Sequence, residues 1–362
     1  MLNFLYKYFL RKLLFLLNPE TAHKVVETLL YVTPNKIFNV FFRYNFNKDT
    51  STTIFGNSVP SPIGIAAGLD KDYKSTPKYL SLGFGFSVVG TTMINPRKGN
   101  PKPRVIRDKS KGELVNSLSF PSEGSSKILK RLKNYPSPKE RIIISISGSS
   151  EEEIVENLLL FKDYCFAVEI NISSPNTSDL KKFVNPNSIR SILNKSRAVT
   201  KLPIFIKLPR LLEIEYYDEL IEASQEFDKV GVVLSNTLPI TDSRLSVGNG
   251  GRSGKSLFES TLSILKYVRK SFPEITILCS GGISSPEQVK ILLESGANAL
   301  QIYTALVYEG PGLIKKINDS LLSNWIYKII EPWLFRSFNS IKVWQFAICN
   351  TSLNCETESC II

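Results

Sequence analysis

Residues 275–282 read Ile-Thr-Ile-Leu-Cys-Ser-Gly-Gly, a short apolar run that ends in a polar residue and two glycines. Seven other stretches have the same form, and a helical stretch follows each run. They are residues 63–67, 86–91, 141–148, 166–174, 203–209, 229–237 and 299–305. Strands that are apolar on both faces are typical of a parallel sheet covered by helices. Eight such strands alternating with helices predict an α/β protein with a (β/α)8 TIM barrel.

The carboxyl ends of these strands are where a barrel of this kind carries its active site. They hold 67–71, Gly90-Thr91, Ser145, 171–177, Lys207, 235–237, Gly281-Gly282 and Tyr303-Thr304. Amide and hydroxyl side chains that converge with two lysines indicate a pocket for a planar, anionic ligand rich in hydrogen-bonding groups. Because Asp and Glu are nearly absent from these ends and histidine is missing from them, we predict no metal site.

Glycines at two strand ends point to a phosphate group. Gly281-Gly282 follows the seventh strand and Tyr303-Thr304 follows the eighth, where barrels bind phosphate through backbone N–H groups. The stretch 250–254, Gly-Gly-Arg-Ser-Gly, follows the sixth strand. Ordinary glycine turns remain the alternative for each of them singly, but their position at these strands favours phosphate binding.

Charge and histidine content narrow the chemistry. The chain has 362 residues, with 45 Lys and Arg against 33 Asp and Glu, which gives a formal net charge of +12. Such an excess suggests an anionic partner, which could be a phosphorylated cofactor, an acidic substrate, a lipid surface or nucleic acid. The single histidine, His23, is far in sequence from the glycine-rich motifs. We therefore expect catalysis without histidine.

The N-terminal segment differs from the barrel pattern. Lys7, Arg11 and Lys12 interrupt the apolar run of residues 1–17, so neither a secretory signal nor a membrane span is expected. Asn18-Pro19 provides an N-cap and a first-turn proline, which predicts two short helices in succession. A third apolar cluster covers residues 37–46. Leu and Phe beside Lys and Arg are typical of helices in a bilayer interface, and a helical cap on the main domain is the alternative.

Several ordered motifs carry a family resemblance. They are Ala67-Gly68-Leu69-Asp70-Lys71-Asp72, 99–104, Asn171-Ile172-Ser173-Ser174-Pro175-Asn176-Thr177, 281–283 and 301–305. With them the chain resembles the dihydroorotate dehydrogenases from about residue 9 to residue 317. Residues 18–23, Asn-Pro-Glu-Thr-Ala-His, and the Gly-Leu-Asp-Lys-Asp motif resemble those of the membrane-associated, quinone-reducing class 2. In that class the N-terminal helices form the quinone tunnel.

The resemblance implies oxidation of dihydroorotate to orotate in de novo pyrimidine (UMP) biosynthesis, with a hydride passing to FMN and electrons then passing to a membrane quinone. Ser174 would be the base that removes the C5 proton. The implied substrate-binding residues are Lys71, Asn116, Ser117, Leu118, Ser119, Phe120, Asn171, Asn176, Asn236 and Thr237. The implied flavin-binding residues are Ala67, Gly68, Lys71, Thr91, Ser145, Asn171, Lys207, Ser235, Gly254, Gly281, Gly282, Tyr303 and Thr304. Among them, Lys207 would lie near flavin N1.

Some interior motifs depart from the quinone-linked class. Residues 116–121 read Asn-Ser-Leu-Ser-Phe-Pro where that class has Asn-Arg-x-Gly-Phe-Asn, Ser145 replaces an asparagine, and Arg210 replaces an aspartate. Because the first two changes lean toward the soluble class, fumarate or NAD remains an alternative acceptor. A flavin barrel that reduces uridine in transfer RNA is a weaker alternative, since neither its cysteine nor its RNA-binding domain is visible. A membrane-bound flavin protein without activity is the third.

These observations divide the chain into three parts. Residues 1–48 are expected to form a helical membrane- and quinone-binding extension, residues 49–319 the FMN-binding barrel, and residues 320–362 a tail to which we assign no function. The expected partners are dihydroorotate and orotate, a membrane quinone and an anionic membrane surface, with no nucleic acid and no assigned oligomeric state. We expect a peripheral protein on the cytoplasmic face of the cell membrane.

Overall fold

Eight parallel strands close into a barrel in the computed structural model, which describes residues 2–47, 50–173, 182–211 and 213–322. In barrel order they are β3 (Ile63–Ile65), β4 (Phe86–Thr92), β7 (Ile142–Ile146), β8 (Ala167–Asn171), β9 (Ile204–Lys207), β10 (Val230–Leu234), β13 (Ile277–Ser280) and β14 (Ala299–Ile302). Each lies within or overlaps one of the eight predicted runs. The prediction of a (β/α)8 barrel is confirmed.

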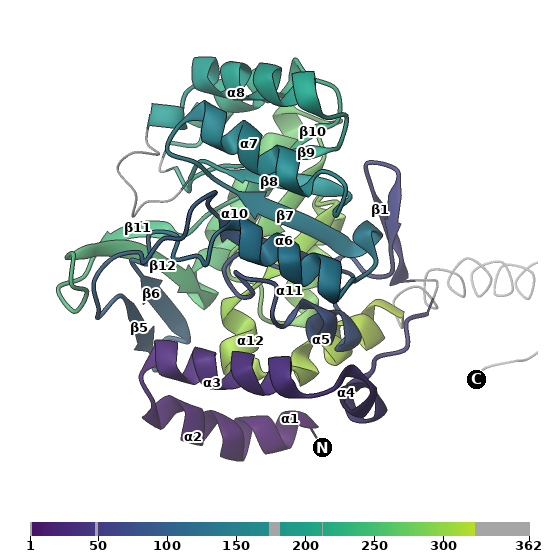
Figure 1. Cartoon of the computed structure of the whole chain (residues 1–362), viewed down its shortest axis with the longest axis vertical. Helices are drawn as coiled ribbons and strands as arrows, with labels where there is room; N and C mark the ends of the chain where they lie inside the picture. The colour runs from purple at the N-terminus through teal and green to yellow at the C-terminus, as the bar shows by residue number, and fades with distance from the viewer. Residues whose placement is uncertain (1, 48–49, 174–181, 212, 323–362) are drawn as a thin grey trace, which may run out of the picture.

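A helix follows each barrel strand in the sequence, and the labelled helices lie on the outside of the barrel (Figure 1). These helices are α5 (Thr76–Ser81), α6 (Ser125–Asn134), α7 (Glu151–Phe161), α8 (Pro186–Val199), α9 (Tyr216–Gln225), α10 (Phe258–Ser271), α11 (Pro286–Glu294) and α12 (Thr304–Glu309). Several begin at side-chain caps, because Ser150, Asn185 and Ser285 each accept a hydrogen bond from an N–H of the first turn. Each cap fixes the residue at which the preceding strand-to-helix loop ends, and it thereby helps to position the polar residues of that loop.

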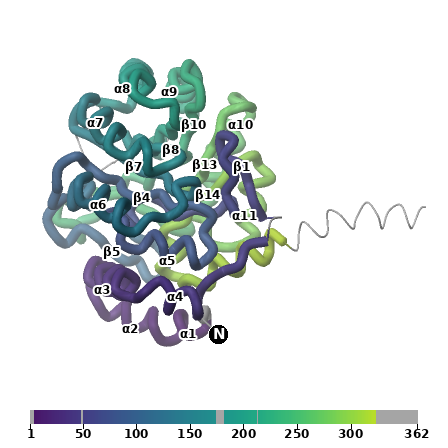
Figure 2. The backbone as a smooth tube through the Cα atoms, turned by 45° about the vertical axis from the view of Figure 1, so that its right-hand side comes forward, coloured from purple at the N-terminus to yellow at the C-terminus, as the bar shows by residue number. Residues whose placement is uncertain are grey.

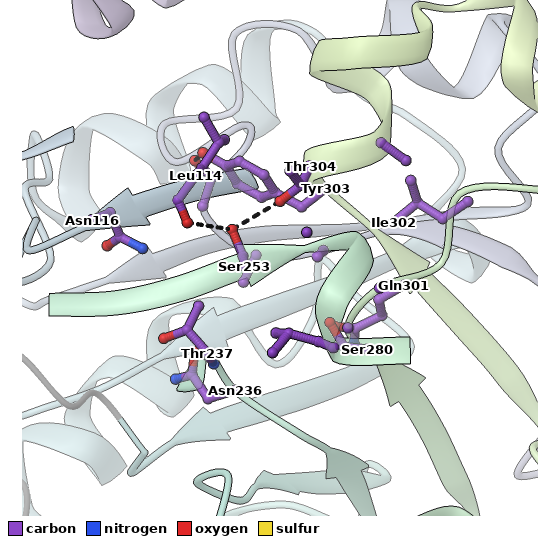
Figure 3. A pocket seen from close by; sticks show the side chains of 18 of the residues that line it. Leu114, Asn116, Asn236, Thr237, Ser253, Ser280, Gln301, Ile302, Tyr303 and Thr304 are labelled. Carbon is purple, nitrogen blue, oxygen red and sulfur yellow. Dashed lines mark hydrogen bonds between the residues drawn. The ribbon is translucent and has the colours of Figure 1, made fainter. Parts of the chain in front are cut away.

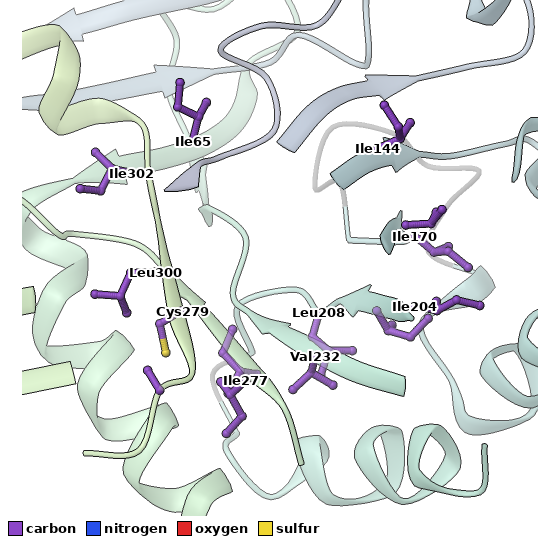
Figure 4. Close-up of a cluster of buried hydrophobic side chains, with 14 of the residues drawn as sticks. Ile65, Ile144, Ile170, Ile204, Leu208, Val232, Ile277, Cys279, Leu300 and Ile302 are labelled. Atoms are coloured by element: carbon purple, nitrogen blue, oxygen red, sulfur yellow. The ribbon is translucent and has the colours of Figure 1, made fainter. Parts of the chain in front are cut away.

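The hydrophobic core has two layers. The larger layer lies between strands and helices and includes Ile144, Ile170 and Val232 (Figure 4). The smaller layer fills the barrel interior at the amino ends of the strands with side chains such as Phe86 and Phe205. The hairpin of β1 (Thr52–Ile54) and β2 (Asn57–Val59) adds Ile54 and Val59 to this inner layer. That end of the barrel is therefore closed, and the carboxyl ends of the strands are left for ligands.

A second, antiparallel sheet stands over the carboxyl ends, in the order β11-β12-β6-β5. Its strands are β5 (Val105–Asp108), β6 (Glu113–Asn116), β11 (Leu238–Thr241) and β12 (Asn249–Gly254). They belong to the insertions after β4 and β10, and pairing of Glu113 with Gly254 joins the two insertions. The sequence did not predict these strands because they are short and, in β12, rich in glycine, so they lack the apolar pattern of a strand.

The N-terminal helices pack on one side of the barrel, beside α5, α12 and β5 (Figure 2). The first helix comprises α1 (Leu2–Leu5), a π-helical segment η1 (Tyr6–Leu10) and α2 (Arg11–Leu16), and it is followed by α3 (Pro19–Val32) and α4 (Asn35–Phe42). Asn18 caps α3 by accepting a hydrogen bond from the Glu20 N–H at 3.1 Å, as expected. The apolar cluster at 37–46 supplies the third helix, α4, which the prediction of two helices did not include.

Polar contacts dock these helices on the barrel. The Arg11 guanidinium donates to the Tyr308 carbonyl at 2.7 Å, and Arg107 of β5 donates to the carbonyls of Leu14 and Leu17 near the end of α2. Arg104 and Glu20 form a half-buried ion pair at 2.8 Å. Within the described ranges, no helix combines the length and the apolar character that a membrane crossing requires.

Candidate active site

A cavity opens at the carboxyl ends of the barrel strands, beneath the antiparallel sheet (Figure 3). It encloses about 1340 Å³ of space not filled by atoms, part of which is open to solvent. Residues from the ends of β3, β9, β10, β13 and β14 line it together with residues of β6 and β12. The position agrees with the place where ligands bind in barrels of this kind.

Most of the predicted site residues line this one cavity. They are Ala67, Gly68, Lys71, Thr91, Asn116, Leu118, Ser119, Phe120, Asn171, Lys207, Ser235, Asn236, Thr237, Gly254, Gly281, Gly282, Tyr303 and Thr304. Ser117 and Ser145, which we expect to contact substrate and flavin, are fully buried and are not among the residues that line the cavity. Ser174 and Asn176 fall outside the described residues. The structure thus brings together residues that are up to 237 positions apart in the sequence, from Ala67 to Thr304.

A buried carboxylate that the sequence did not predict lies behind this lining. Glu169 of β8 has no exposed surface, and its Oε1 is 3.4 Å from the Nζ of Lys207. Ser145 Oγ donates to the same carboxylate at 2.8 Å, and Gln301 Nε2 donates to it at 3.1 Å. Because an unpaired buried charge is strongly unfavourable, these partners stabilise both Glu169 and Lys207. A glutamate in the middle of an apolar strand was the sequence signal that could have revealed it.

Two asparagines are held in fixed orientations at the cavity wall. Asn171 Nδ2 donates to Thr91 Oγ1 at 2.9 Å, while its Oδ1 accepts from Ser173 Oγ at 3.0 Å. Asn236 Nδ2 donates to Ser173 Oγ at 2.9 Å, and the Asn236 Oδ1 accepts from the Thr237 N–H at 2.8 Å. Oriented amides of this kind provide matched donors and acceptors for a ligand with alternating polar edges.

Lys71 connects the cavity with the N-terminal helices. Its Nζ donates to the Gly68 carbonyl at 2.8 Å, and burial lowers its pKa although Glu27 and Asp72 act in the opposite direction. His23 of α3 lies in the field of the same lysine. Burial, together with the positive charges of Lys71 and Lys74, lowers the pKa of His23 to about 3. His23 is therefore neutral at physiological pH. The fold brings it near Lys71 of the motif at residues 67–72, although the two residues are far apart in sequence.

The glycines after β13 form a loop that no other residue could replace without a shift. Gly281 and Gly282 have φ angles of 127° and 78°, and a Cβ on Gly282 would lie 2.3 Å from the backbone nitrogen of Phe258. The N–H groups of both glycines donate to no acceptor in the part of the chain that the structure describes. Thr304 and Ser253 line the same cavity, and their Oγ1 and Oγ atoms are 2.8 Å apart (Figure 3). Such a loop can accept the oxygens of an anion.

Comparison with known proteins agrees with this geometry. The family model described as dihydroorotate dehydrogenase matches residues 50–324. A dihydroorotate dehydrogenase (quinone) from Nitratiruptor sp. is 32% identical over 335 residues, which cover 86% of this chain and 93% of the relative. One from Coxiella burnetii is 32% identical over 349 residues, covering 88% of this chain and 96% of the relative.

Solved structures show the same architecture. The ligand-free DHODH of Eimeria tenella has a TM-score of 0.75 and 25% identity, and the match covers 84% of this chain and 94% of that one. The structure of the same enzyme in complex with ferulenol has a TM-score of 0.76, with 24% identity over 86% of this chain and 92% of that one. On the family match and the sequence relatives, the chain belongs to the dihydroorotate dehydrogenase family of oxidoreductases.

Proposed function

We propose that this protein oxidises dihydroorotate to orotate in pyrimidine biosynthesis and passes the electrons through bound FMN to a membrane quinone. The observation that carries the proposal is a cavity whose lining unites a glycine loop for phosphate, a buried lysine and a set of oriented amides. The family match and the curated relatives, named dihydroorotate dehydrogenase (quinone), support the reaction and the acceptor.

The residues present fit FMN. Gly254, Gly281 and Gly282 all have positive φ angles and line the cavity. The N–H groups of Gly281 and Gly282, which have no acceptor among the described residues, would hold the phosphate with Tyr303 and Thr304. Gln301 lines the same cavity, and its buried Oε1 has no hydrogen-bond partner among the described residues, which leaves an acceptor for a ligand. When bound, FMN would supply the hydride acceptor that the reaction requires.

Lys207 and Lys71 would supply the positive charge. Lys207 comes from the floor of the cavity, where its Nζ would face the N1 and O2 edge of the flavin ring and favour negative charge there. Glu169 holds that Nζ from behind at 3.4 Å, so the ammonium group has a defined position. Lys71 would lie between substrate and flavin, and Ala67, Gly68, Thr91 and Ser235 would line the ring.

Substrate would bind against the amides. Asn116, Asn171, Asn236 and Thr237 line the cavity and would hydrogen-bond the ring and the carboxylate of dihydroorotate, with Asn176 completing the set. Ser174 would remove the C5 proton. It follows directly after Ser173, whose hydroxyl and carbonyl oxygens accept from Asn236 Nδ2. A serine is a poor base in water, so its surroundings must help the proton leave.

The N-terminal extension, residues 1–48, would bind the membrane and admit the quinone. Its helices expose large apolar side chains, among them Leu13, Leu16, Val40 and Phe41. Exposed cations on the same segment, Lys12, Lys24, Lys36 and Arg43, would face anionic headgroups. The protein would then lie on the cytoplasmic face of the membrane as a peripheral protein.

Sedimentation with lipid vesicles tests the membrane contact. We expect the protein to bind anionic vesicles better than neutral ones, and binding should weaken as salt rises because the charges are screened. Leu16→Asp with Phe41→Asp should reduce binding further. The control, Leu159→Asp with Ile291→Asp, alters exposed apolar residues of α7 and α11 and should have no effect. Equal loss from both pairs, or indifference to salt, would contradict the assigned surface.

Anaerobic stopped-flow spectroscopy tests the reaction and the acceptor together. Dihydroorotate should bleach the flavin promptly, and a quinone should reoxidise it faster than fumarate or NAD does. Faster reoxidation by fumarate or NAD would assign the soluble-class acceptor. A yellow protein that dihydroorotate does not bleach would be a flavin protein without this activity.

A further inference from the structure

Arg210 is a buried arginine just beyond the carboxyl end of β9, with 4% of its surface exposed. Its Nη1 donates to Ser260 Oγ at 2.8 Å, and its Nη2 donates to Thr261 Oγ1 at 2.9 Å and to the Ser280 carbonyl at 3.4 Å. Its Nε donates to the Asn236 carbonyl at 3.2 Å. All four acceptors are uncharged oxygens. They satisfy hydrogen-bond donors of the Arg210 guanidinium but do not balance its positive charge.

No carboxylate compensates the charge of Arg210 in the described part of the chain. The other buried ionic groups of the site are matched differently: Glu169 accompanies Lys207, and Asp70 accepts hydrogen bonds from three backbone N–H groups and from Thr76. Burial lowers the pKa of Arg210, and the groups that raise it are Tyr217 and Cys279. Burial also raises the pKa of both of these groups, so neither carries a negative charge at neutral pH. A buried guanidinium without a counter-ion is costly, so an anion that reaches it is strongly favoured.

The guanidinium lies directly against the glycine loop. A Cβ on Gly281 would be 2.5 Å from the Nη2 of Arg210, while Gly281 itself lines the cavity. Only the thickness of one backbone segment therefore separates the charge from a ligand in the loop. In an interior of low dielectric constant, a charge at that separation still acts strongly on an anion.

Arg210 also acts on the loop through the peptide bond. The Ser280 carbonyl and the Gly281 N–H belong to one peptide group. That carbonyl accepts from Arg210 and from the Ser235 N–H at 3.1 Å. Donation to a carbonyl polarises the peptide group and makes its N–H a stronger donor. The Gly281 N–H, which has no acceptor in the described ranges, is thereby prepared for an anionic oxygen.

We propose that Arg210 is a positioning residue whose buried charge is balanced by the phosphate of the flavin nucleotide, so that it makes the site select a phosphorylated flavin over an uncharged one. This inference rests on the proposed function, in which a flavin nucleotide occupies the cavity. It assigns a role to a position where the chain departs from the usual aspartate.

The test compares FMN with riboflavin, which has the same ring and lacks the phosphate. Binding of both to the flavin-free full-length chain is measured by quenching of flavin fluorescence. Arg210→Met should raise the Kd for FMN at least about tenfold, or about 1.4 kcal/mol, and leave the Kd for riboflavin within about twofold. Arg210→Lys keeps the charge, and its Kd for FMN should stay within about threefold of the original.

Arg141 provides the matched control. It is a half-buried arginine directly before β7, at the opposite end of the barrel, and it donates to the carbonyls of Leu80, Phe84 and Gly85. Arg141→Met removes a comparable charge and comparable hydrogen bonds. It should lower thermal stability while leaving the ratio of the FMN and riboflavin Kd values unchanged.

Equal weakening of FMN and riboflavin by Arg210→Met would overturn the inference, because it would show a merely structural role. Loss of FMN selectivity in Arg210→Lys would overturn it as well, since the charge is retained there. If Arg210→Met does not fold, Arg210→Gln removes the charge with a smaller change in polarity and is measured in its place. An unaltered chain that binds neither flavin would contradict the proposed function itself.

Discussion

The two ends of the barrel are built from the same strands but in opposite ways. At the amino ends, Phe86 and Phe205 fill the interior and the β1–β2 hairpin closes it. At the carboxyl ends, Glu169 and Lys207 are buried in a network of hydrogen bonds, and the cavity opens beyond them. Figure 1 shows the hairpin and the antiparallel sheet on opposite sides of the barrel. Burying polar groups at the carboxyl ends reduces the stability of the fold, and the contrast indicates that apolar packing at the amino ends offsets this loss.

The largest expected effect lies at the open end and concerns the proposed base. Ser174→Ala should slow reduction of the flavin by dihydroorotate about 10²- to 10⁴-fold, because proton removal loses its base, while FMN and orotate still bind. Single-turnover stopped-flow spectroscopy measures the rate. Ser224→Ala is the control, since that buried hydroxyl donates within α9 to the Leu220 carbonyl. An unchanged rate in Ser174→Ala would show that another group takes the proton.

At the closed end we expect a large effect on stability alone. Phe205 is fully buried, and its ring centroid lies 5.3 Å from that of Phe55 in the hairpin. Phe205→Ala should lower the free energy of unfolding by about 3–5 kcal/mol, through lost burial and the cavity left behind. Denaturant titration of the holoenzyme measures it, with exposed Leu159→Ala as control. If the flavin reduction rate falls tenfold or more in Phe205→Ala, the amino ends of the strands affect catalysis as well as stability, which contradicts this expectation.

The smallest expected effect concerns a charge at the rim of the open end. Glu123 contacts Lys74 at 2.6 Å and Arg131 at 2.5 Å. Although partial burial raises the pKa of Glu123, hydrogen bonds and charges from these two residues lower it further, to about 2. Glu123→Gln should cost about 0.5–1 kcal/mol of unfolding free energy at pH 7, because the carboxylate is largely solvated and screened.

The pH dependence of that cost follows from the direction of the shift. A carboxylate whose folded pKa is lower than its unfolded value stabilises the fold above the unfolded value of 4.5. Its contribution is lost as the pH falls through about 2. The difference in unfolding free energy between the original chain and Glu123→Gln, measured by denaturant titration, should therefore decrease as the pH falls from 4.5 to about 2. Glu294→Gln, in a pair on α11 with an N–O distance of 3.9 Å, is the control and should show no measurable difference.

Part of the site could be predicted because its residues belong to local motifs. Gly281-Gly282, Asn171 and Lys207 each stand at the end of an apolar run, and parallel strands bring such ends to one edge whatever the details of packing. Ser145 marks the limit of this reasoning. Its place at a strand end predicts contact with the flavin, whereas the partners that the structure gives its hydroxyl are Glu169 and Thr91. Which side of a strand end faces a ligand depends on neighbouring strands.

The sequence by itself determined the eight strands, the helices between them and the edge that carries the polar residues, because hydrophobic periodicity and capping are local properties of the chain. Only the tertiary structure decided which residues distant in sequence contact one another. Glu169 meets Lys207 across 38 positions of sequence, Glu113 pairs with Gly254, and Arg210 reaches Gly281 through space. Such contacts follow from closure of the barrel and from the register of its strands, which places distant residues within a few ångströms of one another.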